Sequence, residues 1–460
     1  MRQSDGDHGV VPDVYRLSPA FIPRSRYHSA DYLKLEREQL FTNTWLAACR
    51  MEEVENPGSF LEFDVTGRSI LIVRDGDGEL RVFHNTCRHR GTRLATGRGR
   101  TGKLICPFHG WRWNLDGSIN YVLDPEQFTA SCLDDLTLMK VPFGTWGGWI
   151  FINLGDDPEP LDEYLDPLPN FLELLELDKM RLRWSRTTRV RCNWKHSLDA
   201  FSEAYHVAQS HPQLVRKDHE RTNPPTLREL ENRYAVEAQP LGRHSRWQFR
   251  PRPGSYSRLT DDLDLLANRI EYVARAGFTF MEQDVELADS LRGKQVPENM
   301  TGRQYFLSLR ADHMRRSGIE WHELSEAELS RSEGNYLCYP NMIIDVVTQG
   351  VALIHRAFPD GDDPESCLFE TSVLQLQPEE TREHPSTVEP EFYDDWRDFD
   401  WGPILNQDFN NMEQMAAGGR SSAFLGHNIN TVQEMMLYYA HETADHYLFG
   451  APLPERKVVG

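Results

Sequence analysis

The sequence predicts an α+β protein in which a small all-β domain is followed by a larger domain of strands and helices. Two patterns indicate this class. Between about residues 59 and 155, apolar and polar residues alternate in short runs separated by turns, as β-strands require. Further along, strand-like runs between about residues 342 and 376 stand between helical segments near 193–211 and 389–448.

The chain has 460 residues, which is enough for two or three domains. The β-domain is predicted over residues 41–157. Its strands include 69–73, which an Asp-Gly-Asp-Gly turn follows, and 149–153. The stretch 156–169 is acidic and contains several prolines, so it indicates a linker to the larger domain, predicted over residues 158–460.

Composition excludes several classes of protein. The net charge of −21 argues against nucleic acid as a partner, because the phosphate backbone would be repelled. Seven scattered cysteines do not form the pattern of a secreted disulfide framework. The first residues are polar, so we expect no signal peptide, and no apolar run is long enough to span a membrane. We therefore expect a cytoplasmic protein.

Four candidate metal ligands lie in two short motifs of the predicted β-domain. The motifs are Cys87-x-His89 and, after sixteen intervening residues, Cys106-x-x-His109. Two thiolates and two imidazoles can hold a Rieske [2Fe–2S] cluster, in which both cysteines bind one iron and both histidines bind the other. The alternative is a structural zinc site, which uses the same ligand types but pairs Cys with Cys and His with His in zinc fingers. The mixed pairs favour the cluster.

The residues around these ligands extend the pattern. Arg90 and Gly91 follow the first pair, and Pro107, Gly110 and Trp111 surround the second. With these motifs the chain resembles the large (α) subunit of the Rieske non-haem iron ring-hydroxylating oxygenases.

One departure supports the oxygenase branch of the Rieske proteins. Respiratory Rieske proteins carry an additional cysteine in each loop, and here those positions are Thr92 and Phe108. The resemblance implies a helix-grip fold for the catalytic domain, 158–460, with the N-terminal helical segment 1–40 packing on it.

A second group of candidate ligands lies in the helix predicted near 193–211. Glu203 and His206 are about 60° apart on an ideal helix, whereas His211 is about 140° from His206. The two imidazoles can share a metal only if the helix ends or bulges between them, and Pro212 favours such an end because it disfavours helical geometry at the preceding residue. Two histidines and a carboxylate form the facial triad of non-haem Fe(II) oxygenases, which leaves positions open for O2.

The third ligand follows from the resemblance. The oxygenases supply it as an aspartate just upstream of an Asn-Met-Glu-like stretch on a C-terminal helix, and residues 405–413 read Leu-Asn-Gln-Asp-Phe-Asn-Asn-Met-Glu. The resemblance therefore implies Asp408 as the metal ligand, with Asp400 and Glu413 as alternatives.

The resemblance also implies a catalytic role for Glu203. Most relatives have an aspartate there, which hydrogen-bonds an iron-ligand histidine and, across a subunit boundary, a Rieske histidine. By this pattern Glu203 would link His206 to His109 of the partner subunit through a side chain one methylene longer. A carboxylate acceptor would also fix the imidazole tautomer. Relatives often have asparagine where Asp199 stands, and the sequence does not show what Asp199 does.

Taken together, the resemblance implies a terminal oxygenase that receives electrons at the Rieske cluster, passes them to a mononuclear Fe(II) and hydroxylates an aromatic or other cyclic hydrophobic substrate. The sequence contains no nucleotide-binding fingerprint between a strand and a helix and no plant-ferredoxin cysteine run. We therefore expect a separate NAD(P)H reductase, with a ferredoxin as a further option. The resemblance implies a homotrimer, and a β subunit is a further option.

A basic stretch stands out against the acidic chain. Between residues 88 and 103 there are six cationic residues and no acidic one: Arg88, Arg90, Arg93, Arg98, Arg100 and Lys103. Such a stretch is either an ordinary solvated face or a surface that steers an acidic electron donor to the cluster.

Two other functions remain open from the sequence. One lies within the family, an oxidative O- or N-demethylase or a quaternary-amine monooxygenase. The other is a Rieske electron-transfer protein without oxygenase activity. Five residues of the variable region are candidates for lining an apolar substrate pocket, although such residues more often form core: Trp247, Phe249, Phe278, Phe280 and Met281.

Overall fold

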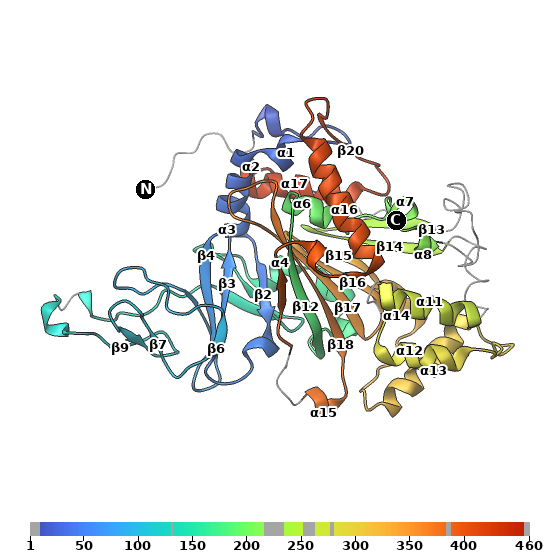
Figure 1. Cartoon of the computed structure of the whole chain (residues 1–460), viewed down its shortest axis with the longest axis horizontal. Coiled ribbons are helices and arrows are strands. Elements are labelled where there is room, and N and C mark those ends of the chain that lie inside the picture. The colour runs from blue at the N-terminus through green and yellow to red at the C-terminus, as the bar shows by residue number, and fades with distance from the viewer. Residues whose placement is uncertain are drawn as a thin grey trace. The chain divides into compact units, whose positions relative to one another are not determined.

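The computed structural model describes residues 10–129, 132–215, 234–251, 263–276, 280–382 and 388–454 (Figure 1). These residues form two compact units. The smaller unit is Phe41–Tyr164, and the larger unit holds the described residues up to Leu40 and from Leu165 onward. One unit is built of short β-strands and the other of a large antiparallel sheet with helices, so the predicted α+β class is confirmed.

The described strands of the smaller unit form three sheets, with the orders β5-β4-β3-β6, β7-β8-β9 and β10-β11-β2. Buried and more exposed residues alternate along β3, which is the two-residue period that the sequence pattern indicated. The strands are β2 (Leu46–Arg50), β3 (Ser59–Val65), β4 (Arg68–Arg74), β5 (Leu80–His84), β6 (Arg98–Arg100), β7 (Leu104–Ile105), β8 (Arg112–Trp113), β9 (Ile119–Tyr121), β10 (Phe143–Trp146) and β11 (Trp149–Ile152).

The core of the smaller unit surrounds the two cysteine motifs. Cys87 and Cys106 are buried in one apolar cluster with large side chains of β4, β5 and β8, among them Phe83 and Trp113. The burial of these side chains stabilises the loops that carry the ligands, because each fully buried large apolar side chain contributes about 1.5–3 kcal/mol to the free energy of unfolding.

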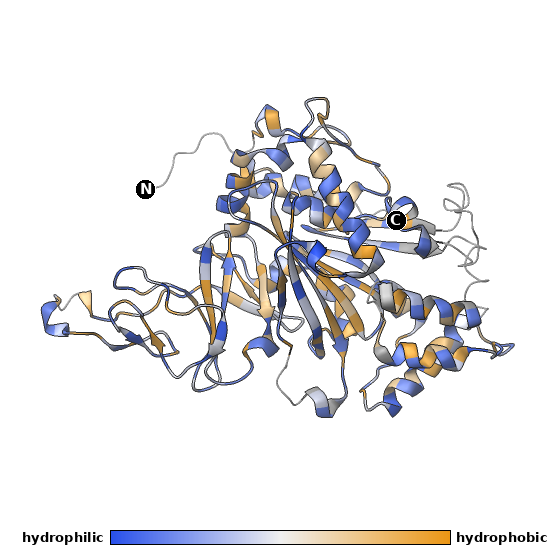
Figure 2. Cartoon of the chain, viewed as in Figure 1, coloured by the Kyte–Doolittle hydropathy of each residue, from blue (hydrophilic) through white to orange (hydrophobic). Residues whose placement is uncertain are grey.

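The larger unit is organised around an eight-stranded sheet with the order β13-β14-β15-β16-β17-β18-β12-β19. Every pairing is antiparallel except that of β12 with β19. The strands are β12 (Met180–Val190), β13 (Tyr234–Leu241), β14 (His244–Pro251), β15 (Gly334–Cys338), β16 (Met342–Thr348), β17 (Val351–Pro359), β18 (Cys367–Leu376) and β19 (Glu391–Tyr393). Apolar residues concentrate in its central strands (Figure 2).

Helices α6 (Trp194–Asp199), α16 (Gly402–Gly419) and α17 (Met435–Phe449) pack against this sheet (Figure 1). Helix α6 contacts β17 and β18, and α16 contacts α6 and β12. The layers therefore bring the segment after α6 next to α16, although they are about two hundred residues apart in sequence. No helix in the described part of the chain is long and apolar enough to cross a membrane.

Regular elements also lie between the helix expected near 193–211 and the strands expected from residue 342, a region for which the sequence analysis predicted none. Between residues 234 and 332 the described residues contain β13, β14 and the helices α11 (Leu263–Ala276), α12 (Glu282–Leu291), α13 (Gly302–Arg316) and α14 (Glu326–Ser332). The strands expected between 342 and 376 are present as β16, β17 and β18. The C-terminal region, expected to be helical, also contains β19 and β20 (Gly426–Asn428).

The N-terminal segment is anchored on the larger unit by buried ion pairs. It contains α1 (Ser25–His28), α2 (Ala30–Leu35) and β1 (Phe21–Pro23), which pairs with β20. Arg26 lies 2.6 Å from Asp445 of α17, and Glu36 lies 2.6 Å from Lys195 of α6. Removing one partner of such a buried pair costs about 3–5 kcal/mol, so the segment is tightly bound to α6 and α17.

Candidate metal centres

The two cysteine motifs form loops with the same backbone hydrogen bonds. The N–H of Cys87 donates to the carbonyl of Thr92 and the N–H of Gly91 to that of Cys87, at 2.8 and 3.0 Å. In the second loop the N–H of Cys106 donates to the carbonyl of Trp111 and the N–H of Gly110 to that of Cys106, again at 2.8 and 3.0 Å. Gly91 and Gly110 have φ values of 82° and 71°, a conformation that residues with a Cβ rarely adopt. This explains why glycine ends both motifs.

The four side chains meet the requirements of a Rieske cluster. The rings of His89 and His109 are 4.7 Å apart, and Cys87 and Cys106 are buried with thiols close enough to interact. His89 Nδ1 and His109 Nδ1 are buried without a hydrogen-bond partner among the described residues. Buried imidazole nitrogens that have no protein partner and lie beside two thiols are typical of metal ligands, so the residues fit a [2Fe–2S] cluster.

The surroundings of the two sulfurs differ. Burial raises the pKa of the Cys87 thiol above its ordinary value. Burial also acts to raise the pKa of Cys106, but the N–H groups of Phe108 and His109 and the hydroxyl of Thr92 outweigh it and lower this pKa. Hydrogen bonds to cluster sulfurs raise the reduction potential of an iron–sulfur centre, and these loops supply such donors.

His206, His211 and Asp408 form the second candidate centre. One ligand atom from each lies within 4.8 Å of the others, the arrangement of a mononuclear metal site. Asp408 Oδ1 is 2.8 Å from His211 Nε2 and 3.7 Å from His206 Nε2, and the two rings are nearly perpendicular. His211 and Asp408 are almost fully buried. Three ligands from two segments leave the remaining positions of a bound metal open.

The single helix expected over 193–211 is wrong, and its interruption makes the site possible. Helix α6 ends at Asp199, residues 200–206 form turns, and α7 (Val207–Ser210) ends before His211. The Ser202 hydroxyl donates to the Leu198 carbonyl. The Glu203 carboxylate accepts from the backbone N–H of His206 at 3.2 Å. Such side-chain bonds compete with helical ones, so the chain turns and both imidazoles reach Asp408.

Both histidines have a second partner at Nδ1 that orients the ring. Glu203 Oε1 accepts a short hydrogen bond from His206 Nδ1, and the side-chain amide of Gln407 lies 2.8 Å from His211 Nδ1. With Nδ1 engaged, each ring directs Nε2 toward Asp408. Burial alone would lower the pKa of His206, but the hydrogen bond that its Nδ1 donates to Glu203 and the negative charge of that carboxylate raise it. The sequence analysis missed Gln407, whose only signal is its place beside Asp408.

The alternatives for the third ligand have other partners. Asp400 accepts from Asn406 at 2.8 Å near the start of α16. Glu413 forms an ion pair with Arg397 and accepts from the Trp396 indole at 3.2 Å. Neither belongs to the group of atoms around His206 and His211 among the described residues.

Asp199 connects α6 to the N-terminal segment. Its Oδ2 accepts from the Tyr27 hydroxyl at 2.6 Å, and that hydroxyl lies 2.9 Å from His441 Nε2. Burial raises the pKa of Asp199 to about 7. The residue whose role the sequence left open thus ties the end of α6, just before the segment with the metal ligands, to the N-terminal segment.

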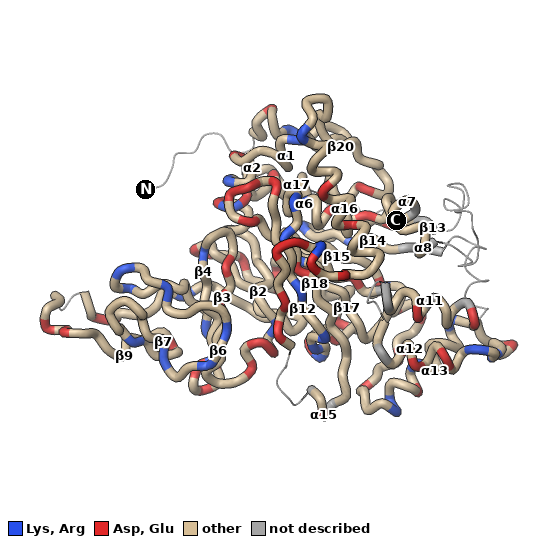
Figure 3. The backbone as a smooth tube through the Cα atoms, viewed as in Figure 1, with Lys and Arg blue, Asp and Glu red and all other residues tan. Residues whose placement is uncertain are grey.

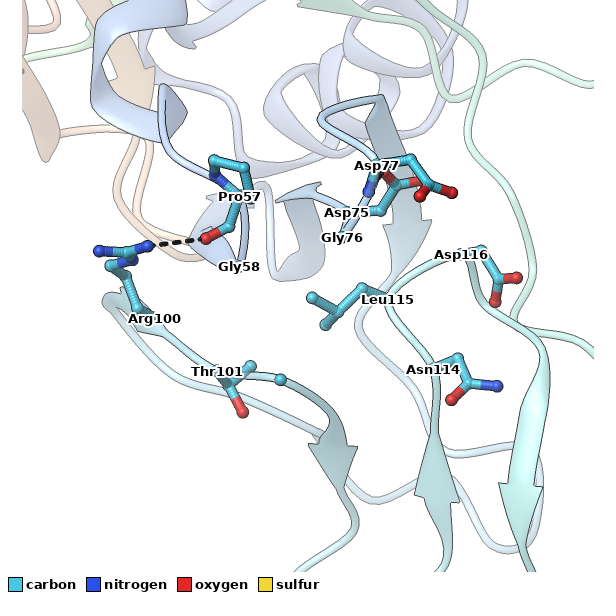
Figure 4. Close-up of a pocket in the computed structure, with 11 residues that line it drawn as sticks. Pro57, Gly58, Asp75, Gly76, Asp77, Arg100, Thr101, Asn114, Leu115 and Asp116 are labelled. Carbon is cyan, nitrogen blue, oxygen red and sulfur yellow. Dashed lines mark hydrogen bonds between the residues drawn. The ribbon is translucent and has the colours of Figure 1, made fainter.

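One cavity of about 610 Å³ lies in the smaller unit (Figure 4). Its lining includes Asp75, Asp77 and Asp116, together with Arg100, which donates to the Pro57 carbonyl. Asp75 already accepts from the N–H groups of Asp77 and Glu79 and from Arg81. These carboxylates hold a turn, and the cavity contains none of the cluster ligands.

The comparisons with known proteins identify the family. Residues 44–133 match the Rieske [2Fe-2S] domain, and residues 177–449 match the ring hydroxylating alpha subunit (catalytic domain). The chain therefore belongs to the ring-hydroxylating oxygenase α subunits, and its smaller unit is a Rieske domain rather than a zinc module. A catalytic domain accompanies the Rieske domain, as the resemblance implied.

Curated relatives match over part of the chain. The glycine betaine monooxygenase oxygenase subunit of Pseudomonas aeruginosa is 30% identical over 196 residues, which are 42% of this chain and 46% of the relative. The Escherichia coli carnitine monooxygenase oxygenase subunit is 30% identical over 44% and 56% of the two chains. The large oxygenase component of salicylate 5-hydroxylase from Ralstonia is 31% identical over 41% and 48%. The chain thus matches about half the length of these relatives.

Solved structures share the fold over nearly the whole chain. Naphthalene 1,2-dioxygenase with bound indole superposes with a TM-score of 0.63 at 16% identity, covering 94% of this chain and 93% of that one. A quaternary ammonium Rieske monooxygenase with L-carnitine gives 0.61 at 17% identity, with 93% and 95% covered.

Proposed function

We propose that this chain is the terminal oxygenase component of a Rieske oxygenase system, with Cys87, His89, Cys106 and His109 as cluster ligands and His206, His211 and Asp408 as ligands of a mononuclear Fe(II). The observation that carries the proposal is the second centre, because an electron-transfer protein needs no open three-ligand site. An Fe(II) bound there would supply O2 activation, and the cluster would supply electrons singly.

The residues of the second centre have separate tasks. Asp408 supplies the anionic ligand, and the two imidazoles supply neutral ones. Glu203 holds the N–H proton of His206 at Nδ1 and so keeps Nε2 of that ring available for the metal, and Gln407 contacts His211 Nδ1 and so orients the second ring. The ligands come from two segments, so the side of the metal away from them is left for O2 and substrate.

We propose that electrons reach this centre in a homotrimer, across a subunit boundary from His109 of the partner subunit to Glu203 and His206. Glu203 accepts from His206 and is 6% exposed, which suits a bridging carboxylate. Glu203→Gln should leave both metals bound and slow reoxidation of the reduced cluster by O2 by about tenfold or more, the lower end of effects seen when such partners are lost. Stopped-flow absorbance of the cluster measures this rate, and reoxidation at the wild-type rate would contradict the bridge.

We further propose that a separate NAD(P)H reductase, directly or through an acidic ferredoxin, delivers electrons at the Rieske domain. Several residues of the basic stretch are already paired, Arg93 with Glu62 and Asp64 and Arg98 with Glu53. The Arg90 guanidinium lies over the exposed ring of Phe108, beside the cluster ligand His109. Basic segments lie along the loops of this unit (Figure 3). Reduction by the donor should slow as salt is added, and a salt-independent rate would contradict this surface.

The relatives support two different substrate classes. The salicylate hydroxylase relative supports the expected aromatic substrate, whereas the glycine betaine and carnitine monooxygenases support the alternative, a quaternary-amine monooxygenase. Of the five candidate pocket residues, Phe278 lies outside the described residues, nothing is described for the side chain of Phe249, and Met281 is fully buried.

We propose a cytoplasmic location, which the seven free cysteines support.

A further inference from the structure

We infer that the larger unit contains a binding site for a substituted ammonium cation, formed by Trp247, Asn335 and Asp345 on the sheet face that α6 covers. The inference rests on the proposed oxygenase function and adds to it the charge and chemical class of the substrate.

The three residues lie side by side in one row across the sheet. Trp247 of β14 is paired with Asn335 of β15, and Asn335 is paired with Asp345 of β16. Directly paired residues of antiparallel strands point to the same face. Neighbouring strands are about 4.8 Å apart, so the backbones at Trp247 and Asp345 are separated by about 10 Å. The row therefore presents an indole, an amide and a carboxylate in turn on one face of the sheet.

The row faces the metal-bearing segment. His355 of β17 is paired with Ile343, which is two residues from Asp345 and therefore shares its face. The His355 ring stacks on that of Phe201, with centroids 4.0 Å apart. The Trp247 indole N–H donates to the Phe201 carbonyl at 2.9 Å. Phe201 is two residues before Glu203, so this face of the sheet adjoins the turn that leads to His206.

Two side-chain acceptors of the row, the Asp345 carboxylate and the Asn335 amide oxygen, have no partner among the described residues. Asp345 forms no ion pair or hydrogen bond with another residue that the structure describes. Its strand neighbours Ile344 and Val346 are fully buried, whereas Asp345 keeps accessible surface. Asn335 is 4% exposed, and its Oδ1 has no hydrogen-bond partner in the described part of the chain. Burial without a partner raises the pKa of Asp345 to about 7. A cation bound beside them would supply the counter-charge that Asp345 lacks among the described residues.

The residue types specify what that ligand is. The metal-ligand group found among the described residues is His206, His211 and Asp408, so Asp345 does not complete a metal site there. A carboxylate supplies the counter-charge of a cation, and the face of an indole is the aromatic surface that binds alkylated ammonium groups best. A neutral aromatic substrate would leave the carboxylate unpaired. The net charge of −21 also raises the local concentration of cations.

The test compares choline with 3,3-dimethylbutan-1-ol, its neutral isostere, by calorimetric titration of the purified holoprotein. Choline should bind about tenfold or more tightly than the alcohol, in the range of a desolvated cation–π contact with a counter-charge. Asp345→Asn should remove this preference, Asp345→Glu should retain it, and Trp247→Leu should weaken choline binding more than alcohol binding. Asp312→Asn, at an exposed position of α13, is the matched control and should change neither.

Equal binding of the two compounds, absence of binding, or a preference that persists in Asp345→Asn would overturn the inference. Iron content and the visible spectrum of the same samples separate this outcome from the proposed function. A choline preference in protein without mononuclear iron would support the cation site and contradict the oxygenase. Full iron content without a preference would contradict the cation site alone.

Discussion

Replacing Asp345 by asparagine should stabilise the protein, and increasingly so as pH rises. In the unfolded chain the aspartate pKa is 3.8, and in the folded protein burial raises it to about 7. Below pH 3.8 the carboxyl is neutral in both the folded and the unfolded state, so its burial lowers the free energy of unfolding least. As the pH rises from 3.8 to about 7, the carboxyl ionises in the unfolded state before it does so in the folded state, and the free energy of unfolding therefore falls. At about 1.36 kcal/mol per pKa unit, the full loss above pH 7 is about 4 kcal/mol.

The assay is urea denaturation of wild-type and Asp345→Asn protein at pH 5 and pH 8, followed by tryptophan fluorescence. Asparagine has nearly the same shape and no charge, so the other titrating groups cancel in the difference between the two proteins. The stabilisation should grow by about 2–3 kcal/mol between these pH values, since part of the loss has already occurred at pH 5. A difference that does not change with pH would refute the unpaired carboxylate, and with it the reasoning for the cation site.

Two further substitutions test the centres themselves. Gln407→Leu should weaken Fe(II) binding at the second centre by about 10–100-fold, the usual effect of losing the partner of a ligand imidazole, and unchanged iron affinity by chelator competition would contradict its role. Gly110→Ala forces a residue with a Cβ to a φ of 71°, so it should cost about 1 kcal/mol or more and speed loss of the cluster, measured by visible absorbance during urea titration. Gly102→Ala is the control, because Gly102 has no positive φ and open space at its Cβ; equal effects would contradict the argument.

The sequence was most informative where chemistry depends on neighbouring residues. Cys87, His89, Cys106 and His109 lie in short loops whose glycines carry the positive φ that closes them, so spacing alone indicated the cluster. The interruption after Asp199 was only partly foreseen. Pro212 explains the end at His211, whereas the turn at 200–206 depends on side chains that bond to the backbone, including Ser202 and Glu203.

Sites built from distant segments needed either the resemblance or the fold. Asp408 reaches His211 from a helix about two hundred residues away, and only the resemblance singled it out. The row of Trp247, Asn335 and Asp345 depends on the register of three strands, and helices α11 to α14 lie between two of these strands in the sequence. No local pattern determines such a register.

The central claim is that one chain holds both a Rieske cluster and a mononuclear iron bound by His206, His211 and Asp408. Iron and acid-labile sulfide analysis of wild-type and Asp408→Ala protein, with the electron paramagnetic resonance of the reduced cluster, tests it most directly. The account predicts about three irons and two sulfides per wild-type chain, and about two irons with an unchanged cluster signal in the variant. An unchanged iron content in Asp408→Ala, or two irons in the fully loaded wild type, would contradict it.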